Sequence, residues 1–125
     1  MEGKNYINVA FVDGTSGDRF ESRNPANFDE ILGTFPLSSE QDVNNAVSAA
    51  KTAYDGWRRL SRIKRGEHFD EFVQLLKKDR EEISRLVTKE CGKGIVEGRA
   101  DVTEGIHMVQ YTFGTVRMPH GDVVD

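Results

Sequence analysis

The residue pattern of the chain changes abruptly between Pro36 and Ser39. Before this point, β-favouring residues such as those of 6–12 are interrupted by turn residues at 13–18, which is typical of strands joined by tight turns. After it, apolar residues recur every three or four positions, which is the spacing of amphipathic helices. The chain therefore divides into a β-rich first part and a helical remainder.

The first part is predicted to form a short antiparallel ribbon. Two strands, 6–12 and 19–22, are expected to pair through a turn near residues 13–17. Pro25 ends the second strand, because proline has no amide hydrogen for the ladder and favours extended geometry in the residue before it. A third short strand is expected at 30–35.

The first predicted helix begins after Ser38. This serine, followed three residues later by Gln41, resembles a capping box. The helix carries many alanines, which allow a close approach to a packing partner. Its apolar stripe consists of Val43, Ala46, Val47, Ala50, Tyr54 and Trp57.

Three further helices are predicted. Ser61 is placed to cap the second, and Asp79 with Glu82 forms an N-terminal box for the third, which is expected to stop at Gly92. A fourth spans about 95–116. Each helix has one apolar stripe, and a small ribbon cannot cover them all. We therefore expect the chain to be incomplete as a folding unit.

Composition restricts the possible partners and compartment. The chain has 125 residues, with 17 basic against 21 acidic side chains and a net charge of -4, so no nucleic-acid or membrane partner is expected. Apolar runs do not approach the roughly 18 residues of a membrane span. A single cysteine cannot form an internal disulfide, and residues 1–10 show no secretory signal. A cytoplasmic localisation is predicted.

Two features invite a catalytic or cofactor-binding interpretation. Cys91 could act as a nucleophile, but it lies near a helix C-terminus, whose dipole raises rather than lowers a thiol pKa. Lys93 lies between two glycines, without the further glycines and the Ser or Thr of a phosphate loop. We interpret Cys91 as structural or incidental, and we assign no catalytic and no cofactor-binding residue.

Three motifs in a fixed order identify a family. They are Asn24-Pro25-Ala26, then Asp42-Val43 followed by the alanine stripe and Trp57, then Glu90-x-Gly92-Lys93. This series resembles the start of an aldehyde dehydrogenase, and residues 97–102 are similar to semialdehyde-oxidising members. The resemblance implies an α/β fold in which residues 1–125 form the N-terminal part of the cofactor-binding domain.

The resemblance also implies a function for a longer protein. The whole enzyme would oxidise an aldehyde or semialdehyde to a carboxylate with NAD or NADP. The family's nucleophilic cysteine, general-base glutamate and dinucleotide-binding turn come later than residue 125. This segment alone is therefore expected to be inactive, to bind no cofactor tightly, and to provide scaffolding and subunit contacts. Its partner would be the remainder of the enzyme or another copy of itself. The alternative is a non-enzymatic helical interaction module or a truncated gene product.

A metal site is also implied by the resemblance. Some aldehyde dehydrogenases hold a monovalent cation with backbone oxygens just before the Asn-Pro-Ala turn and with an aspartate on a later helix. Those positions fall on Ser22, Arg23 and Asp101, and an oxygen-only cage suits a hard cation. Without the family, Glu97, Asp101 and Glu104 form one solvated helix face.

Overall fold

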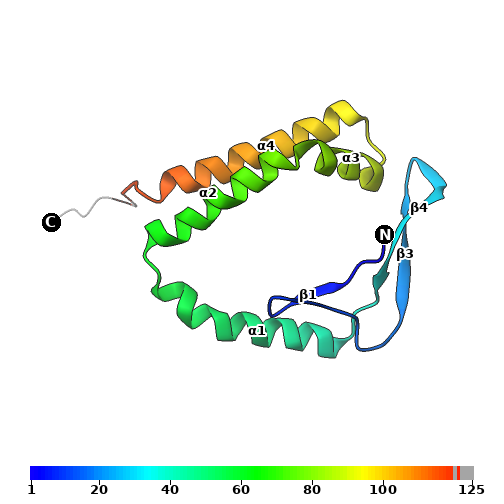
Figure 1. The fold of residues 1–125 in the computed structure, drawn as a ribbon, viewed down its shortest axis with the longest axis horizontal. Coiled ribbons are helices and arrows are strands. Elements are labelled where there is room, and N and C mark those ends of the chain that lie inside the picture. Colours follow the sequence, from blue (N-terminus) through cyan, green and yellow to red (C-terminus); the bar gives the residue numbers. More distant parts are fainter. Residues whose placement is uncertain (120, 122–125) are drawn as a thin grey trace.

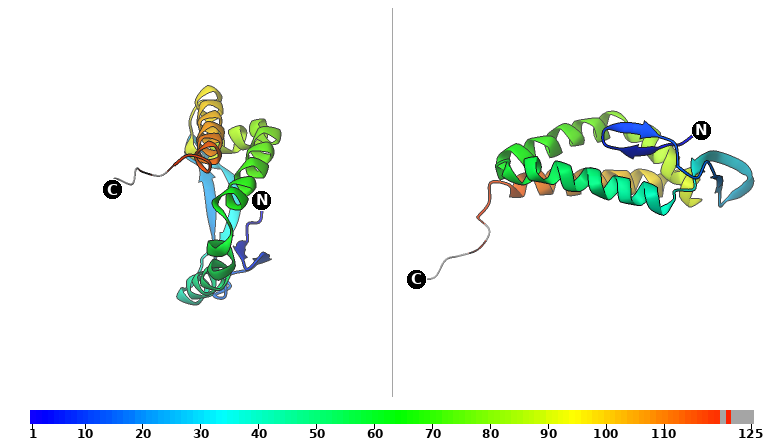
Figure 2. Two further views of the ribbon diagram at one scale, coloured as in Figure 1. Left: turned by 90° about the vertical axis from the view of Figure 1, so that its left-hand side faces the viewer. Right: turned by 90° about the horizontal axis from the view of Figure 1, so that it is seen from below.

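The computed structural model describes residues 1–119 and 121, which form two small antiparallel ribbons followed by four helices. In chain order the elements are β1 (Asn5–Ile7), β2 (Ala10–Val12), β3 (Arg19–Asn24), β4 (Asn27–Pro36), α1 (Glu40–Arg59), α2 (Arg62–Lys78), α3 (Arg80–Cys91) and α4 (Ile95–Thr115). The predicted fold class, a β ribbon followed by four helices, is confirmed. Helices α2, α3 and α4 lie together, α1 lies apart with β1 and β2, and the β3–β4 ribbon connects the two regions (Figures 1 and 2).

The predicted pairing of the first strands is wrong. Residues 6–12 do not form one strand, because the chain reverses at Asn8 and Val9, which have φ of 51° and 64°. Two consecutive positive φ values give the turn geometry that suits a two-residue hairpin. Strand β1 therefore pairs with β2 in an antiparallel ribbon. Asparagine tolerates this conformation, whereas a β-branched valine rarely adopts it.

The second ribbon pairs β3 with β4. Arg19 lies opposite Pro36, and Asn24 lies opposite Asn27. The predicted third strand therefore exists, but it is longer than expected and begins at Asn27. Pro25 ends β3 as predicted, and the Asn24 side chain accepts a hydrogen bond from the amide of Ala26 at 2.9 Å, which fixes the turn between the strands.

The capping box of α1 lies one residue later than predicted. Ser39, with extended geometry (ψ 171°), is the N-cap, and Asp42 is the residue whose carboxylate accepts from the Ser39 amide. The predicted pair Ser38 and Gln41 is therefore wrong. The Asp42 carboxylate also accepts from the amide of Thr15 at 3.1 Å, so the same side chain caps α1 and holds the loop that precedes β3.

The other helix boundaries follow the predictions more closely. Ser61 caps α2 by accepting from the amide of Lys64 at 3.2 Å, and Gly92 ends α3 in the left-handed conformation. Asp79 precedes α3, but its side chain makes no capping hydrogen bond, so the predicted box is wrong. Asp79 also ends α2, where its amide donates to Leu75, and its backbone lacks the extended geometry of an N-cap.

The hydrophobic core lies entirely between α2, α3 and α4. Its buried members are Val73, Val102 and Ile106, and the partly buried residues packed on them are Leu76, Ile83, Val87 and Val109. In α1, by contrast, every side chain is exposed except those of Asp42 and Ala49. None of the helices in the described part of the chain is both long and apolar enough to span a bilayer.

Candidate functional site

The turn between β3 and β4 packs on the end of α3. A Cβ atom added to Gly92 would lie 2.9 Å from Cγ of Pro25 and 3.1 Å from the amide nitrogen of Ala26. Gly92 also has a φ of 67°, which side chains rarely tolerate. Only glycine therefore fits both the backbone and the space. The Asn-Pro-Ala turn and the Glu-x-Gly-Lys motif, far apart in sequence, meet at this junction (Figure 1).

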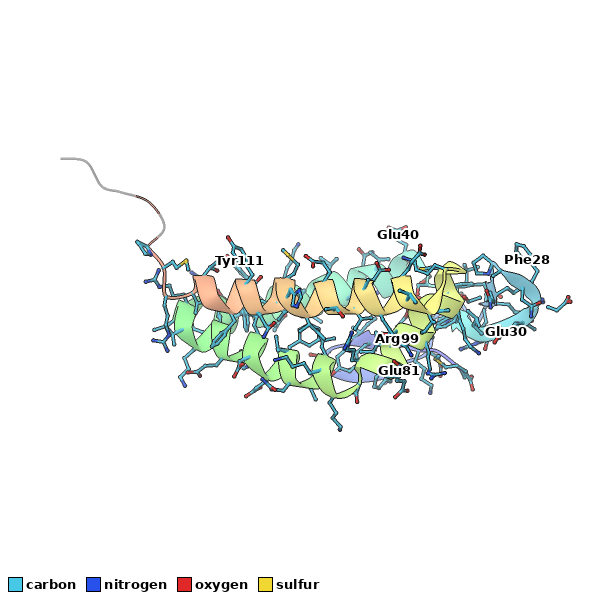
Figure 3. The ribbon with its side chains drawn as sticks, turned by 90° about the horizontal axis from the view of Figure 1, so that it is seen from above. Phe28, Glu30, Glu40, Glu81, Arg99 and Tyr111 are labelled. Atoms are coloured by element: carbon cyan, nitrogen blue, oxygen red, sulfur yellow. The ribbon has the colours of Figure 1, made fainter. Side chains whose placement is uncertain are left out.

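A polar link reinforces the junction. Glu30 of β4 accepts hydrogen bonds from Nζ of Lys89 on α3 and, at 2.8 Å, from the side-chain amide of Asn24. The hydrogen bond from Lys89, and to a smaller extent that from Asn24, holds the pKa of the Glu30 carboxyl below its ordinary value. Figure 3 shows Glu30 on the ribbon beside the end of the helical unit. The ribbon is thus attached to α3 by both a close backbone contact and an ion pair.

The three residues of the predicted cation site lie on two elements. Ser22 and Arg23 belong to β3, where Arg23 donates to the carbonyl of Phe28 at 2.8 Å. Asp101 lies on α4 and accepts a hydrogen bond from Nζ of Lys93. That bond raises the pKa of Lys93, so a positive charge already accompanies the aspartate. The cation site stays a prediction.

Helices α3 and α4 are joined by contacts that the sequence interpretation missed. Arg99 donates two hydrogen bonds to Glu81, at 2.9 and 2.8 Å (Figure 3). Beside them, a Cβ atom on Gly98 would lie 2.6 Å from Oγ1 of Thr88 and 2.8 Å from the carbonyl oxygen of Ser84. The available signal was the pair of small residues, Ser84 and Gly98, on facing helices, because small side chains permit close helix packing.

The arrangement positions structural elements rather than reacting groups. Cys91 is the last residue of α3 and is exposed. Among residues 1–119 and 121, no group of three or more His, Cys, Asp or Glu side chains is arranged to hold a metal ion. What the described residues build is a corner, in which the ribbon is attached to α3 and α3 to α4.

The chain is similar to known proteins over nearly its whole length. The aldehyde dehydrogenase family model matches residues 11–125. Malonate-semialdehyde dehydrogenase 1 of Shouchella clausii is 37% identical over 95% of this chain, which corresponds to 24% of that protein. The chain thus spans about a quarter of the length of such relatives.

Solved structures of aldehyde dehydrogenases show the same similarity. An NAD-dependent aldehyde dehydrogenase from Sinorhizobium meliloti superimposes with a TM-score of 0.91 at 27% identity, covering 98% of this chain and 25% of that one. A putative methylmalonate-semialdehyde dehydrogenase of the same species, complexed with NAD, gives a TM-score of 0.87 at 30% identity, covering all of this chain and 25% of that one. The resemblance drawn from the three motifs is confirmed, and the chain belongs to the aldehyde dehydrogenase family.

Proposed function

We propose that this chain is the N-terminal segment of an NAD(P)-dependent aldehyde dehydrogenase that oxidises a semialdehyde to a carboxylate. The observation that carries the proposal is the similarity of nearly the whole chain to a malonate-semialdehyde dehydrogenase. In the whole enzyme, a cysteine outside this chain would attack the aldehyde carbon, NAD or NADP would accept a hydride, and water would release the acid.

The described residues do not fit the dinucleotide. A pyrophosphate site of this class needs a glycine-rich turn between a strand and a helix, with free amides at the helix start. The one strand-to-helix connection among residues 1–119 and 121 is Leu37-Ser38-Ser39, and the Asp42 carboxylate already occupies the start of that helix. An anionic ligand would be repelled there. The proposal therefore assigns cofactor binding and catalysis to the rest of the enzyme.

The proposed role of this segment is scaffolding and subunit contact. Its exposed apolar residues support this role, since Val9, Phe11, Phe28 and Tyr54, on three parts of the fold, are each at least 60% exposed. The proposed partners are the remainder of the enzyme or another copy of the chain, in the cytoplasm.

The decisive experiment extends the chain. The gene is sequenced beyond the codon of Asp125, and the full translated product is assayed with malonate semialdehyde and other semialdehydes, with NAD or NADP. We expect a continuing reading frame and reduction of the nucleotide. A reading frame that stops at once would contradict the proposal and favour a truncated product or an interaction module. The interaction module is the second candidate, and the exposed face of α1 supports it.

The isolated 125-residue chain provides the control. We expect no turnover and no tight NAD binding in calorimetric titrations. Micromolar affinity, about -8 kcal/mol, would contradict the assignment of the cofactor site to the rest of the enzyme. Turnover that disappears in Cys91→Ser would show that this exposed cysteine is a nucleophile.

A further inference from the structure

Helices α1 and α2 are joined by a bend of two residues, Leu60 and Ser61. Both have extended backbone geometry, with ψ of 141° and 153°. The two helices diverge from this bend, and α1 runs apart from the core formed by α2, α3 and α4 (Figure 1). The backbone hydrogen bonds within each helix do not fix the angle between the two. At this end of α1, the angle therefore depends on side chains that touch across the bend.

One aromatic pair makes such a contact. The indole of Trp57, near the end of α1, faces the imidazole of His68 on α2, with ring centroids 5.6 Å apart and ring planes inclined by 31°. Trp57 is 41% exposed and the side chain of His68 is 58% exposed, so protons from solvent reach the imidazole. The proposed function uses neither ring. The bend is thus bridged by two rings, one of which can change its charge.

Helix α2 places a carboxylate beside the imidazole. Nδ1 of His68 lies 3.9 Å from Oε2 of Glu71, one turn farther along the helix. The other acidic neighbour on this helix, Glu67, is already paired with Lys64 at 2.8 Å. Of the charges on α2, that of Glu71 is therefore the one left to accompany a protonated His68.

The other elements near the pair contribute less. Asp55 and Arg58 of α1 neutralise each other at 2.8 Å. Arg117, in the turn after α4, acts on the carboxylate of Glu67, and its charge opposes a second positive charge nearby. The groups that attract a protonated His68 are therefore the indole face and the Glu71 carboxylate.

Protonation of the imidazole strengthens its contact with the indole. The face of a tryptophan ring carries partial negative charge, and a cation within about 6 Å of the ring centroid is attracted to it. Imidazoles exchange their proton between about pH 5 and 8. At an exposed site this attraction shifts the population of the closed contact about two- to fivefold. The contact is therefore stronger in mild acid than at neutral pH.

We propose that Trp57 and His68 form a pH-sensitive latch across the α1–α2 bend. The latch closes when His68 is protonated and loosens when it is neutral, so it acts on the angle between α1 and the core of α2, α3 and α4. The inference goes beyond the proposed function, because it requires neither the cofactor nor the reaction.

Fluorescence tests the contact directly, because Trp57 is the single tryptophan of the chain. A protonated imidazole in contact with an indole quenches its emission, so the intensity should fall between about pH 8 and 5. His68→Gln should abolish this fall. In the matched control, His107→Gln on α4, the fall should persist, although that imidazole also lies beside a glutamate, Glu104 at 3.7 Å. Circular dichroism verifies that the helices are intact at each pH.

An NMR titration of the His68 imidazole measures the strength of the latch. Trp57→Leu keeps an apolar residue but removes the indole, and the midpoint of the titration should fall by about 0.4–0.7 pH unit. Because linkage is reciprocal, this shift gives the factor by which protonation strengthens the contact. Tyr54→Leu, one turn earlier on α1, is the control and should leave the midpoint unchanged.

Three results would each overturn the inference. The first is an emission intensity that does not change between about pH 8 and 5. The second is a change that remains in His68→Gln, and the third is a His68 midpoint that Trp57→Leu leaves in place. None of them bears on the proposed function, which depends on the sequence beyond Asp125 and on the activity of its product.

Discussion

Helices α1 and α4 have nearly the same length, 20 and 21 residues, but different surroundings. Helix α4 packs on α2 and α3 and buries Val102 and Ile106. Helix α1 buries one side chain, the carboxylate-bearing Asp42. The first region is stabilised by removal of apolar surface from water, whereas the second depends on hydrogen bonds at one end of the helix. The comparison shows that one chain can contain a region with its own core and a region that lacks one.

The largest expected difference between the regions is in the effect of removing an apolar side chain. Ile106→Ala should lower the free energy of unfolding by about 2–5 kcal/mol, because it leaves a cavity in the core. Val47→Ala in α1 should change it by less than about 0.5 kcal/mol, since that side chain is already exposed. Urea unfolding at concentrations that keep the chain monomeric measures both. Equal losses would show that α1 is packed as well as α4.

The junction between the regions should be the next most sensitive place. Gly92→Val should cost about 1–3 kcal/mol, because the new side chain meets Pro25 and Ala26 and adopts a positive φ. Gly105→Ala, in open space on α4, should instead stabilise the chain by about 0.5–1 kcal/mol. Thermal unfolding compares the two variants. A neutral Gly92→Val would mean that the ribbon does not rest on α3.

The cap of α1 should have a smaller and pH-dependent effect. Ser39→Ala should cost about 1 kcal/mol, whereas Ser48→Ala on the exposed face should cost nothing measurable. The pKa of Asp42 lies below its ordinary 3.8, mainly because the Ser39 amide bonds to the carboxylate.

The sign of the pH effect follows from this depressed pKa. The stabilisation is fully present above the unfolded pKa of about 3.9 and is lost as the pH falls through the lower folded value. Hydrogen exchange at the Thr15 amide should therefore accelerate in acid. Two results would contradict this role. One is an exchange rate at Thr15 that changes with pH only as that of an unprotected amide does, and the other is a rate that Asp42→Asn leaves unchanged.

The smallest effect is expected at the exposed ion pair. Lys89→Met should raise the pKa of Glu30 towards its ordinary value of 4.5, because the hydrogen bond from Lys89 is the main cause of its depression. An NMR titration of the Glu30 carboxyl measures the change, with Lys78→Met as a control on another helix. Stability should barely change, since exposed ion pairs contribute little. An unchanged pKa would show that Lys89 does not hold the ribbon.

The sequence predicted the helices better than the ribbons. The helix boundaries at Ser61, Gly92 and Ile95 follow from local residues, because caps and left-handed glycines act within one turn of the chain. The β1–β2 hairpin could not be predicted in this way. Its turn contains Val9, which is a poor residue for a positive φ, so the local preference indicates a continuous strand. The structure instead pairs β1 with β2 across this turn.

The candidate site shows the same division. The motifs at Asn24-Pro25-Ala26 and Gly92 were visible in the sequence, but their meeting was not. The ion pairs of Lys89 with Glu30 and of Arg99 with Glu81 join residues on different elements. No local sequence pattern predicts which acidic side chain will pair with a given basic one. The same limit applies to Asp101, which bonds to Lys93.

The sequence by itself determined the family, the change from ribbon to helices near Pro36 and the four amphipathic stripes, because these depend on residue types at fixed spacing. The tertiary structure alone decided which stripes were buried. The stripes of α2, α3 and α4 face one another, and small residues such as Gly98 permit their close contact. The stripe of α1 is equally regular but stays exposed, because burial depends on what lies opposite a face and not on the face itself.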